Sequence, residues 1–355
     1  MAPFSRVGAS SKPGAVQFAH LERAGIRAWV VNAHFVKHVP GRKTDMLDSE
    51  WLAVLARFGL VRASFIPPQD LRELRLVSRY RRRINACLSS EINRQHKLLD
   101  DAGIKLGGVV ADLHGVSARA MVQGLIQGRS PAELLSHARG ALKRKLEPLL
   151  LSLEGELSPR HRFVLTQLQS HIEQLEQELA RLDAYLLDAM QPYAWAHRLL
   201  QTIPGIDQMA AAMIVIEIGD DMGRFGAASR LACWAALSPG NNESAGKRKR
   251  SHTGKGNHVI RALLCECANA ARMSTSSLAG KFRSLLVRKT YKKAIVALAH
   301  KMLRLIYAML SRRQAYQDPH IDYAALSAKK NAPRWIRQLQ LIGALPTPKG
   351  TAPAT

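Results

Sequence analysis

The sequence is poor in acidic residues, in aromatic residues and in cysteine. Its 355 residues include 27 Asp and Glu against 52 Lys and Arg, which gives a formal net charge of +25. A chain with this imbalance repels itself unless a polyanion is near, so composition favours nucleic acid as the partner, with an acidic membrane surface second. Because aromatic residues make up only 6% of the chain, a helix-rich fold is favoured over a large β-sandwich.

Long apolar runs and a secretion signal are also missing. No stretch approaches the ~18 uncharged apolar residues of a membrane-spanning helix, and residues 1–18 contain no apolar core of a signal peptide. The sequence therefore predicts no membrane contact. The four cysteines form no C-x-x-C motif: Cys87, Cys233, Cys265 and Cys267. We expect reduced, buried thiols in a cytoplasmic protein, without a zinc site or a disulfide framework.

Hydrophobic periodicity predicts a mainly helical chain with a small α/β part. Residues 1–18 show no periodicity and are expected to be disordered or irregular. Residues 26–33 suit a buried strand, and residues 44–60 a helix that Gly59 ends. The later units that we expect are a basic helical connector at 76–157, a coiled-coil helix at 158–192, a helical domain at 196–310 and a mostly irregular tail at 311–355.

A regular apolar stripe runs through residues 163–190. Its members alternate steps of three and four: Leu165, Leu168, Ile172, Leu175, Leu179, Leu182 and Leu186. This a/d spacing is typical of a left-handed coiled coil. We expect a homo-oligomer that pairs through this helix. The alternative is a long amphipathic helix packed on its own domain.

Two carboxylates near a predicted helix N-terminus form the first candidate site. Asp45 and Asp48 are three residues apart, so they lie on one face of the helix and could share a divalent metal such as Mg²⁺. Acidic residues in a first turn also complement the helix dipole. Spacing alone favours this second interpretation.

A serine beside a run of basic residues forms the second candidate site. Ser244 is followed by Ala and Gly, which allow close backbone approach, and then by a cluster of cations: Lys247, Arg248, Lys249, Arg250 and, farther on, Lys255. Such a cluster can bind phosphate and stabilise charge on a transferring phosphoryl group, while an activated serine can act as nucleophile. Composition alone favours a solvated basic loop, and nucleic-acid contact is the safer prediction.

Two further features could contact nucleic acid. The turn at residues 204–206, with Gly205 at its centre, resembles a helix-hairpin-helix, whose backbone N–H groups can hold a DNA phosphate. A turn that packs the core is an equal alternative. The second feature is an arginine-rich helical segment that suits a backbone or RNA-groove contact: Arg72, Arg75, Arg79, Arg81, Arg82 and Arg83.

These motifs combine into a family resemblance. Residues 41–81 resemble the latter half of the DEDD domain of the insertion-sequence one-ten family of transposases, and residues 203–271 resemble the family's second, serine-bearing domain. The motifs occur in the family's order, and the resemblance extends over about residues 19–310. It implies a partial RuvC-like, RNase H-type α/β domain at 19–75 and an all-α transposase domain. The fold class that we predict is therefore mainly α with a truncated α/β part.

The resemblance also implies a mechanism. Asp45 and Asp48 match the third and fourth acids of a magnesium site, and Ser244 matches a serine that attacks DNA and forms a covalent phosphoserine. In such enzymes the acids and the serine come from different protomers, and a non-coding guide RNA pairs with target and donor DNA. The residues implied as catalytic are Ser244, Asp45 and Asp48, and those implied to bind metal are Asp45 and Asp48.

One departure from the family concerns the first two acids. Residues 1–18 contain no Asp or Glu, so we expect these two ligands to be missing, either because the reading frame starts late or because the copy is degenerate. A site with two of four ligands should hold magnesium poorly. The functional alternatives are a DNA invertase of the pilin-gene type and a non-catalytic nucleic-acid-binding relic.

Overall fold

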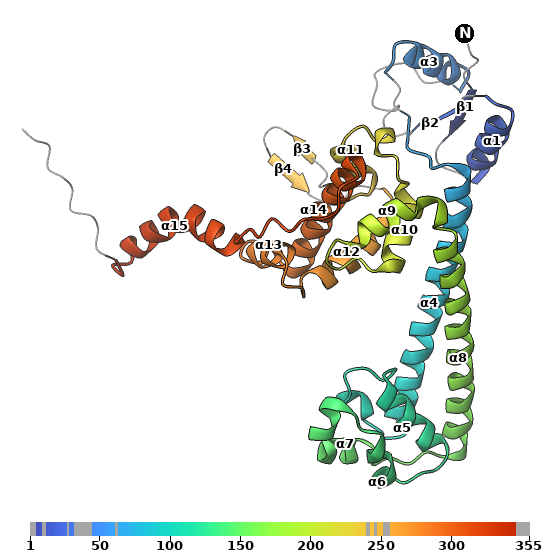
Figure 1. The fold of residues 1–355 in the computed structure, drawn as a ribbon, viewed down its shortest axis with the longest axis vertical. Coiled ribbons are helices and arrows are strands. Elements are labelled where there is room, and N and C mark those ends of the chain that lie inside the picture. The colour runs from blue at the N-terminus through green and yellow to red at the C-terminus, as the bar shows by residue number, and fades with distance from the viewer. Residues whose placement is uncertain are drawn as a thin grey trace, which may run out of the picture. The chain divides into compact units, whose positions relative to one another are not determined.

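Helices dominate the fold, which a computed structural model describes for residues 5–8, 12–26, 28–31, 45–60, 63–238, 242–244, 247–250 and 256–345 (Figure 1). The chain divides into two compact units. Unit 1 combines Met1–Leu71 with Trp195–Thr355, and unit 2 comprises Arg72–Ala194. The few strands are short and pair in twos, so the predicted mainly α fold class is confirmed.

Unit 1 begins with a β-α-β motif. Strands β1 (Ser5–Gly8) and β2 (Ala28–Val31) pair in parallel, and helix α1 (Lys12–Arg23) connects them. Parallel strands joined by a helix are the basic unit of α/β folds. The prediction that residues 1–18 are irregular is therefore wrong for β1 and for the start of α1. Four residues are too few to show periodicity, and it is pairing with β2 that makes Ser5–Gly8 a strand.

Helix α3 (Asp45–Arg57) follows β2 in the chain. The side chains of Leu52 and Leu55 are buried, and Gly59, at φ +69°, ends the helix by adopting the left-handed conformation that glycine tolerates. The chain then returns to the strands, because the N–H of Ser64 donates to the carbonyl of Val30 at 2.7 Å. The predicted helix and its glycine stop are confirmed.

Seven helices build the rest of unit 1 among the described residues. They are α9 (Ala194–Gln201), α10 (Gln208–Ile218), α11 (Ala228–Trp234), α12 (His258–Ala271), α13 (Ser277–Leu286), α14 (Tyr291–Arg312) and α15 (Tyr323–Leu341). The central helix α14 packs on α11, α12 and α13. By length and hydropathy α14 could cross a membrane, against the expectation from sequence, but half of its most apolar stretch is buried in the unit. Its hydropathy is that of a core helix.

Helix α15 corrects the predicted irregular tail at 311–355. It is 19 residues long, and it packs on α13 even though Pro333 lies inside it. Proline and the alanine-rich composition suggested an unstructured segment. Contact with α13 supplies the stabilisation that the local sequence does not show.

Unit 2 is built on two long helices that lie side by side (Figure 1). Helix α4 (Gln69–Asp101) and helix α8 (Pro159–Asp188) meet where Ile84 packs on Leu175 and Leu179. A larger core, which includes Leu99, Met121 and Leu165, joins them to the shorter helices. These helices are α5 (Val116–Ile126), α6 (Pro131–Leu134) and α7 (Leu146–Ser152).

The apolar stripe of residues 163–190 therefore finds its partner within the chain. Its buried members are Leu165, Ile172, Leu175, Leu179 and Leu186. The helix that covers them in the middle of the stripe is α4, as expected for the alternative of an amphipathic helix packed on its own domain. Pairing of two copies of the chain through this helix stays a prediction. An a/d pattern shows that a helix pairs with another, but it carries no information on whether the partner belongs to the same chain.

The four cysteines are free, and they differ in exposure. Cys267 is buried, as expected, and burial raises the pKa of its thiol to about 12. Cys87 and Cys233 are exposed, so the expectation of buried thiols is wrong for these two. Both occupy outward positions on amphipathic helices, and their small apolar side chains gave no sign of this.

Candidate active site and nucleic-acid interface

The first turn of α3 carries the candidate carboxylates. Asp45 is the first residue of the helix, and Asp48 lies three residues later in the same turn. Buried Leu52 and Leu55 fix the helix farther along. Carboxylates in a first turn are stabilised by the positive end of the helix dipole. The position of the two aspartates thus fits both interpretations that the sequence leaves open.

The described residues do not complete a metal site. Nowhere in the described part of the chain do three or more His, Cys, Asp or Glu side chains gather. Mg²⁺ takes an octahedral set of oxygen ligands, and Asp45 and Asp48 supply only part of that set. The complete ligand set of a magnesium site therefore stays a prediction.

Ser244 lies in a β-hairpin, where the sequence predicts a loop. Strand β3 (Asn242–Ser244) pairs antiparallel with strand β4 (Lys247–Arg250), and the register sets Ser244 opposite Lys247 beside the turn. The signal for this hairpin was available, because the two-residue connection Ala-Gly contains the glycine that tight hairpins prefer. The pairing brings the backbone of the serine next to the start of the basic run.

Four of the candidate cations belong to this hairpin, whereas the carboxylates belong to another element. Lys247, Arg248, Lys249 and Arg250 form β4 itself, whereas Lys255 lies outside the described residues. Across the described residues, α3 makes no extensive contact with β3 or β4. Ser244 and the aspartates thus come from separate elements of unit 1.

Asn257 forms hydrogen bonds with α11, α12 and Glu217 next to the stretch that contains the serine hairpin. Its N–H donates to the carbonyl of Trp234 at 2.9 Å, which joins the end of α11 to the start of α12. Its side-chain oxygen caps α12 by accepting from the N–H of Val259 at 2.9 Å, and its amide donates to the buried Glu217 carboxylate at 2.6 Å. The backbone is therefore joined at Trp234 and Asn257, which lie on either side of the hairpin in the sequence.

Replacing Asn257 with alanine is expected to lower the free energy of unfolding of unit 1 by about 2 kcal/mol. Loss of the helix cap costs about 1 kcal/mol, and a similar amount follows because the buried Glu217 carboxylate loses a donor. Urea denaturation followed by circular dichroism measures the change.

Asp207→Ala is the matched control for this prediction. Asp207 caps α10 by accepting from the N–H of Ala210 at 2.7 Å, but it is exposed and bonds no buried carboxylate in the described structure. Its replacement should cost only about 1 kcal/mol. An equal decrease in the free energy of unfolding for the two variants would contradict a stabilising role for the hydrogen bond from Asn257 to Glu217.

Gly205 packs against a helix end. It adopts φ +87° between α9 and α10, and a Cβ at this position would lie 2.5 Å from the nitrogen of Ala271 and 2.5 Å from the carbonyl oxygen of Cys267. The bare Cα therefore fits against the last turn of α12. This contact favours the core-packing alternative for the turn, and a DNA phosphate contact at Gly205 stays a prediction.

The six arginines of α4 are not equivalent. Arg81 forms an ion pair with Asp183 of α8, with Nη2 2.9 Å from Oδ2, and only 18% of its side chain is exposed. Arg79 and Arg83 are exposed, while Arg82 is half-buried. Arg72 and Arg75 are also half-buried. A phosphate would have to displace the carboxylate of Asp183 to reach Arg81, so Arg81 has a structural role that charge counting did not reveal.

Two family models match the chain on either side of unit 2's short helices. The model described as "Transposase IS116/IS110/IS902 family" matches residues 197–283, which include the serine hairpin, and a DEDD-type transposase model of the same group matches residues 6–104, which include α3. The chain belongs to the IS110/IS116 family of transposases. The resemblance inferred from the sequence is confirmed.

Individual relatives of this transposase carry similar names. A "Probable family 20 transposase" from Pseudomonas aeruginosa is 25% identical over 303 residues, which cover 84% of this chain and 81% of the relative. The "Transposase for insertion sequence element IS1111A" from Coxiella burnetii is 28% identical over 210 residues, 57% of each chain. Transposases cut and join DNA, and the DEDD match suggests a divalent-metal requirement.

Proposed function

We propose that this transposase moves an insertion sequence by serine attack on DNA. The observation that carries the proposal is the hairpin that sets Ser244 opposite Lys247, at the start of four consecutive basic residues. This hairpin lies inside the region 197–283 that the transposase family model matches. Cations beside a hydroxyl nucleophile attract the phosphate and stabilise the charge that develops on it.

The proposed reaction proceeds in two balanced steps. The Oγ of Ser244 attacks a DNA phosphorus, a Ser–O–P bond forms, and one strand-end hydroxyl leaves with the proton that the serine gives up. A hydroxyl of another DNA end then attacks the phosphoserine, which restores the serine and joins the strands. Lys247, Arg248, Lys249, Arg250 and Lys255 would hold the phosphates on either side of the break.

The carboxylates and the partners complete the proposal. Asp45 and Asp48 would contribute to a Mg²⁺ site whose remaining ligands come from elsewhere, for example from DNA phosphates. A guide RNA would select the DNA by base pairing, and a second copy of the chain would bring its serine to these aspartates. The proposed place of action is the cytoplasm.

The alternative is a nucleic-acid-binding relic without catalysis. The observation that favours it is the incomplete set of metal ligands among the described residues. The relic would retain the basic surface and bind DNA in a salt-dependent way, but it would break no strand.

Covalent capture of DNA separates the two functions. The purified full chain is incubated with DNA of its insertion-sequence ends, RNA transcribed from the element and Mg²⁺, and the products are run on a denaturing gel. A protein–DNA adduct that requires Mg²⁺ supports the transposase. Salt-sensitive DNA binding without any adduct supports the relic and contradicts the proposal.

A further inference from the structure

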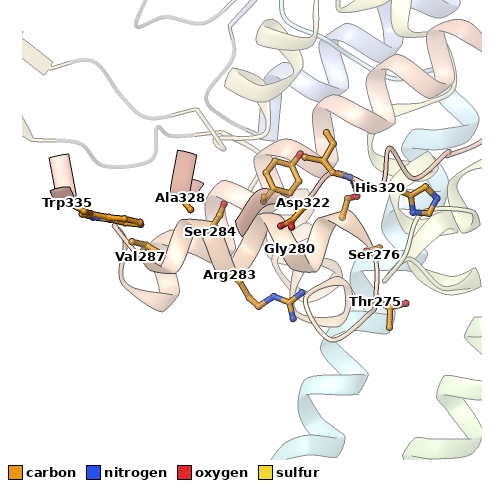
Figure 2. A pocket seen from close by; sticks show the side chains of 13 residues that line it. Thr275, Ser276, Gly280, Arg283, Ser284, Val287, His320, Asp322, Ala328 and Trp335 are labelled. Atoms are coloured by element: carbon orange, nitrogen blue, oxygen red, sulfur yellow. Dashed lines mark hydrogen bonds between the residues drawn. The ribbon is translucent and has the colours of Figure 1, made fainter. Parts of the chain in front are cut away.

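A cavity of about 550 Å³ lies between α13, α15 and the segment that precedes α15 (Figure 2). It is not part of the serine hairpin or of the first turn of α3. The second region that a family model matches ends at residue 283, so α15 and most of the cavity wall lie beyond both matched regions. Neither the family match nor the proposed reaction assigns this cavity a role.

Hydrogen bonds hold the walls of the cavity in place. The backbone N–H of Ser277 donates to Oδ2 of Asp318 at 2.8 Å, and the N–H of Ile321 donates to Oγ of Ser277 at 3.0 Å. At the other end, the guanidinium of Arg288 donates to the side-chain oxygen of Asn331, which joins α13 to α15. The cavity is therefore preformed, as binding sites for small flat groups usually are.

Two aromatic side chains line the cavity. The ring of Tyr323 lies near two ammonium groups, those of Lys281 and Lys301, at 5.0 Å and 4.8 Å from its centroid. Trp335 lines the cavity beside Val287 (Figure 2), and 43% of the tryptophan is exposed. An indole that faces an open cavity offers a stacking surface for another flat ring.

The surroundings are strongly basic. Residues 276–345 include 14 Lys and Arg, two Asp and no Glu. One of the two acids, Asp318, already accepts hydrogen bonds from the N–H groups of Ser277 and His320. The other, Asp322, lines the cavity and accepts from the N–H of Ala325 at 3.0 Å. Arg283 lies in the cavity wall, and α15 adds four more cations without an acid: Lys329, Lys330, Arg334 and Arg337. This balance suits a polyanion.

We propose that the cavity binds an unpaired base of a DNA strand. The base would stack on Trp335, serine and threonine hydroxyls of the wall would meet its polar edge, and Arg283 with the cations of α15 would hold the flanking phosphates. Bases of a duplex are stacked on one another and could not enter, so the site selects single strands. The inference rests on the proposed function insofar as it takes DNA as the partner, and it extends the DNA contact to a surface away from the serine.

Binding of short oligonucleotides to the full chain tests the site. Fluorescence anisotropy would compare a labelled single strand of twelve thymidines, the corresponding duplex and an RNA of twelve uridines. The wild type should prefer the single DNA strand, and Trp335→Ala should weaken its binding about tenfold or more. Arg283→Gln should reduce the slope of log K against log salt by about one unit per lost phosphate contact.

Matched variants make the result decisive. Phe163→Ala removes another exposed aromatic residue, which lies on α8 of unit 2 and does not line the cavity, and should leave binding unchanged. Trp335→Phe keeps a ring and should recover most of the affinity, which distinguishes stacking from a local folding defect. Binding that is equal for Trp335→Ala and wild type, or that favours duplex or RNA, would overturn the proposal, as would a loss explained by dissociation of an oligomer in sedimentation.

The outcomes for this site and for the proposed function are separable. A chain that binds single strands through Trp335 but forms no phosphoserine adduct retains the cavity assignment and loses the catalytic one. A chain that forms the adduct, but binds single strands equally well with and without Trp335, retains the catalytic assignment and loses the cavity assignment.

Discussion

Replacing Ser244 with alanine is expected to abolish the protein–DNA adduct and to lower strand cleavage by on the order of 10³-fold or more. The reason is chemical, because the methyl group of alanine cannot form the Ser–O–P bond. The hairpin itself should survive, since serine and alanine are of similar size and the strand pairing of β3 with β4 uses backbone groups. DNA affinity should therefore stay within about twofold of the wild type, because phosphate contacts supply most of it.

Ser251→Ala is the control for this experiment. It removes a hydroxyl from the same basic stretch, seven residues after Ser244, and changes no charge. It should form the adduct at the wild-type rate. An adduct that persists in Ser244→Ala and disappears in Ser251→Ala would refute the choice of nucleophile while keeping serine chemistry. Adduct formation by both variants would show that neither Ser244 nor Ser251 is the required nucleophile.

The fold was predictable where local signals decide it. The helix α3 and its end at Gly59 follow from apolar spacing and from the one residue type that accepts a left-handed conformation cheaply. Strand β1 and helix α15 were missed for the same physical reason. Each depends on a partner element, β2 or α13, so its short or proline-containing sequence carries little evidence by itself.

The pairing of α8 with α4 shows a second limit on what can be predicted from the sequence. The heptad spacing correctly indicated a helix with a buried stripe, but the partner turned out to be α4 of the same chain. Arg81 illustrates the consequence for charge, because its ion pair with Asp183 joins residues about a hundred positions apart. Charge patterning of α4 alone could not distinguish this arginine from its exposed neighbours.

The residues of the candidate sites also fall into those that the sequence predicts and those that only the structure reveals. Residue chemistry and family resemblance were enough to nominate Asp45, Asp48 and Ser244. The support of the serine loop needed the structure, although Asn257 before an apolar run is a recognisable helix cap. Trp335 gave no signal at all, because its place in a cavity wall arises only when α15 packs on α13.

Replacing Gly205 with alanine is expected to destabilise unit 1 by about 3 kcal/mol or more. The new Cβ would lie 2.5 Å from two backbone atoms of α12, and a helix backbone yields far less easily than a flexible side chain. The left-handed φ of +87° adds about 1 kcal/mol of strain for any residue with a Cβ. Thermal and urea unfolding of the full chain would measure the loss.

Gly25→Ala separates the packing cost from the backbone strain. Gly25 has a similar φ of +71°, but a Cβ there would meet no atom within 4 Å, so its replacement should cost only about 1 kcal/mol. If Gly205 instead served to bring a DNA phosphate to the backbone, Gly205→Ala would unfold with about the same loss as Gly25→Ala and would show a selective fall in DNA affinity. A large loss of stability in Gly205→Ala, with DNA affinity retained at temperatures below its unfolding transition, would show that the turn serves to pack against α12.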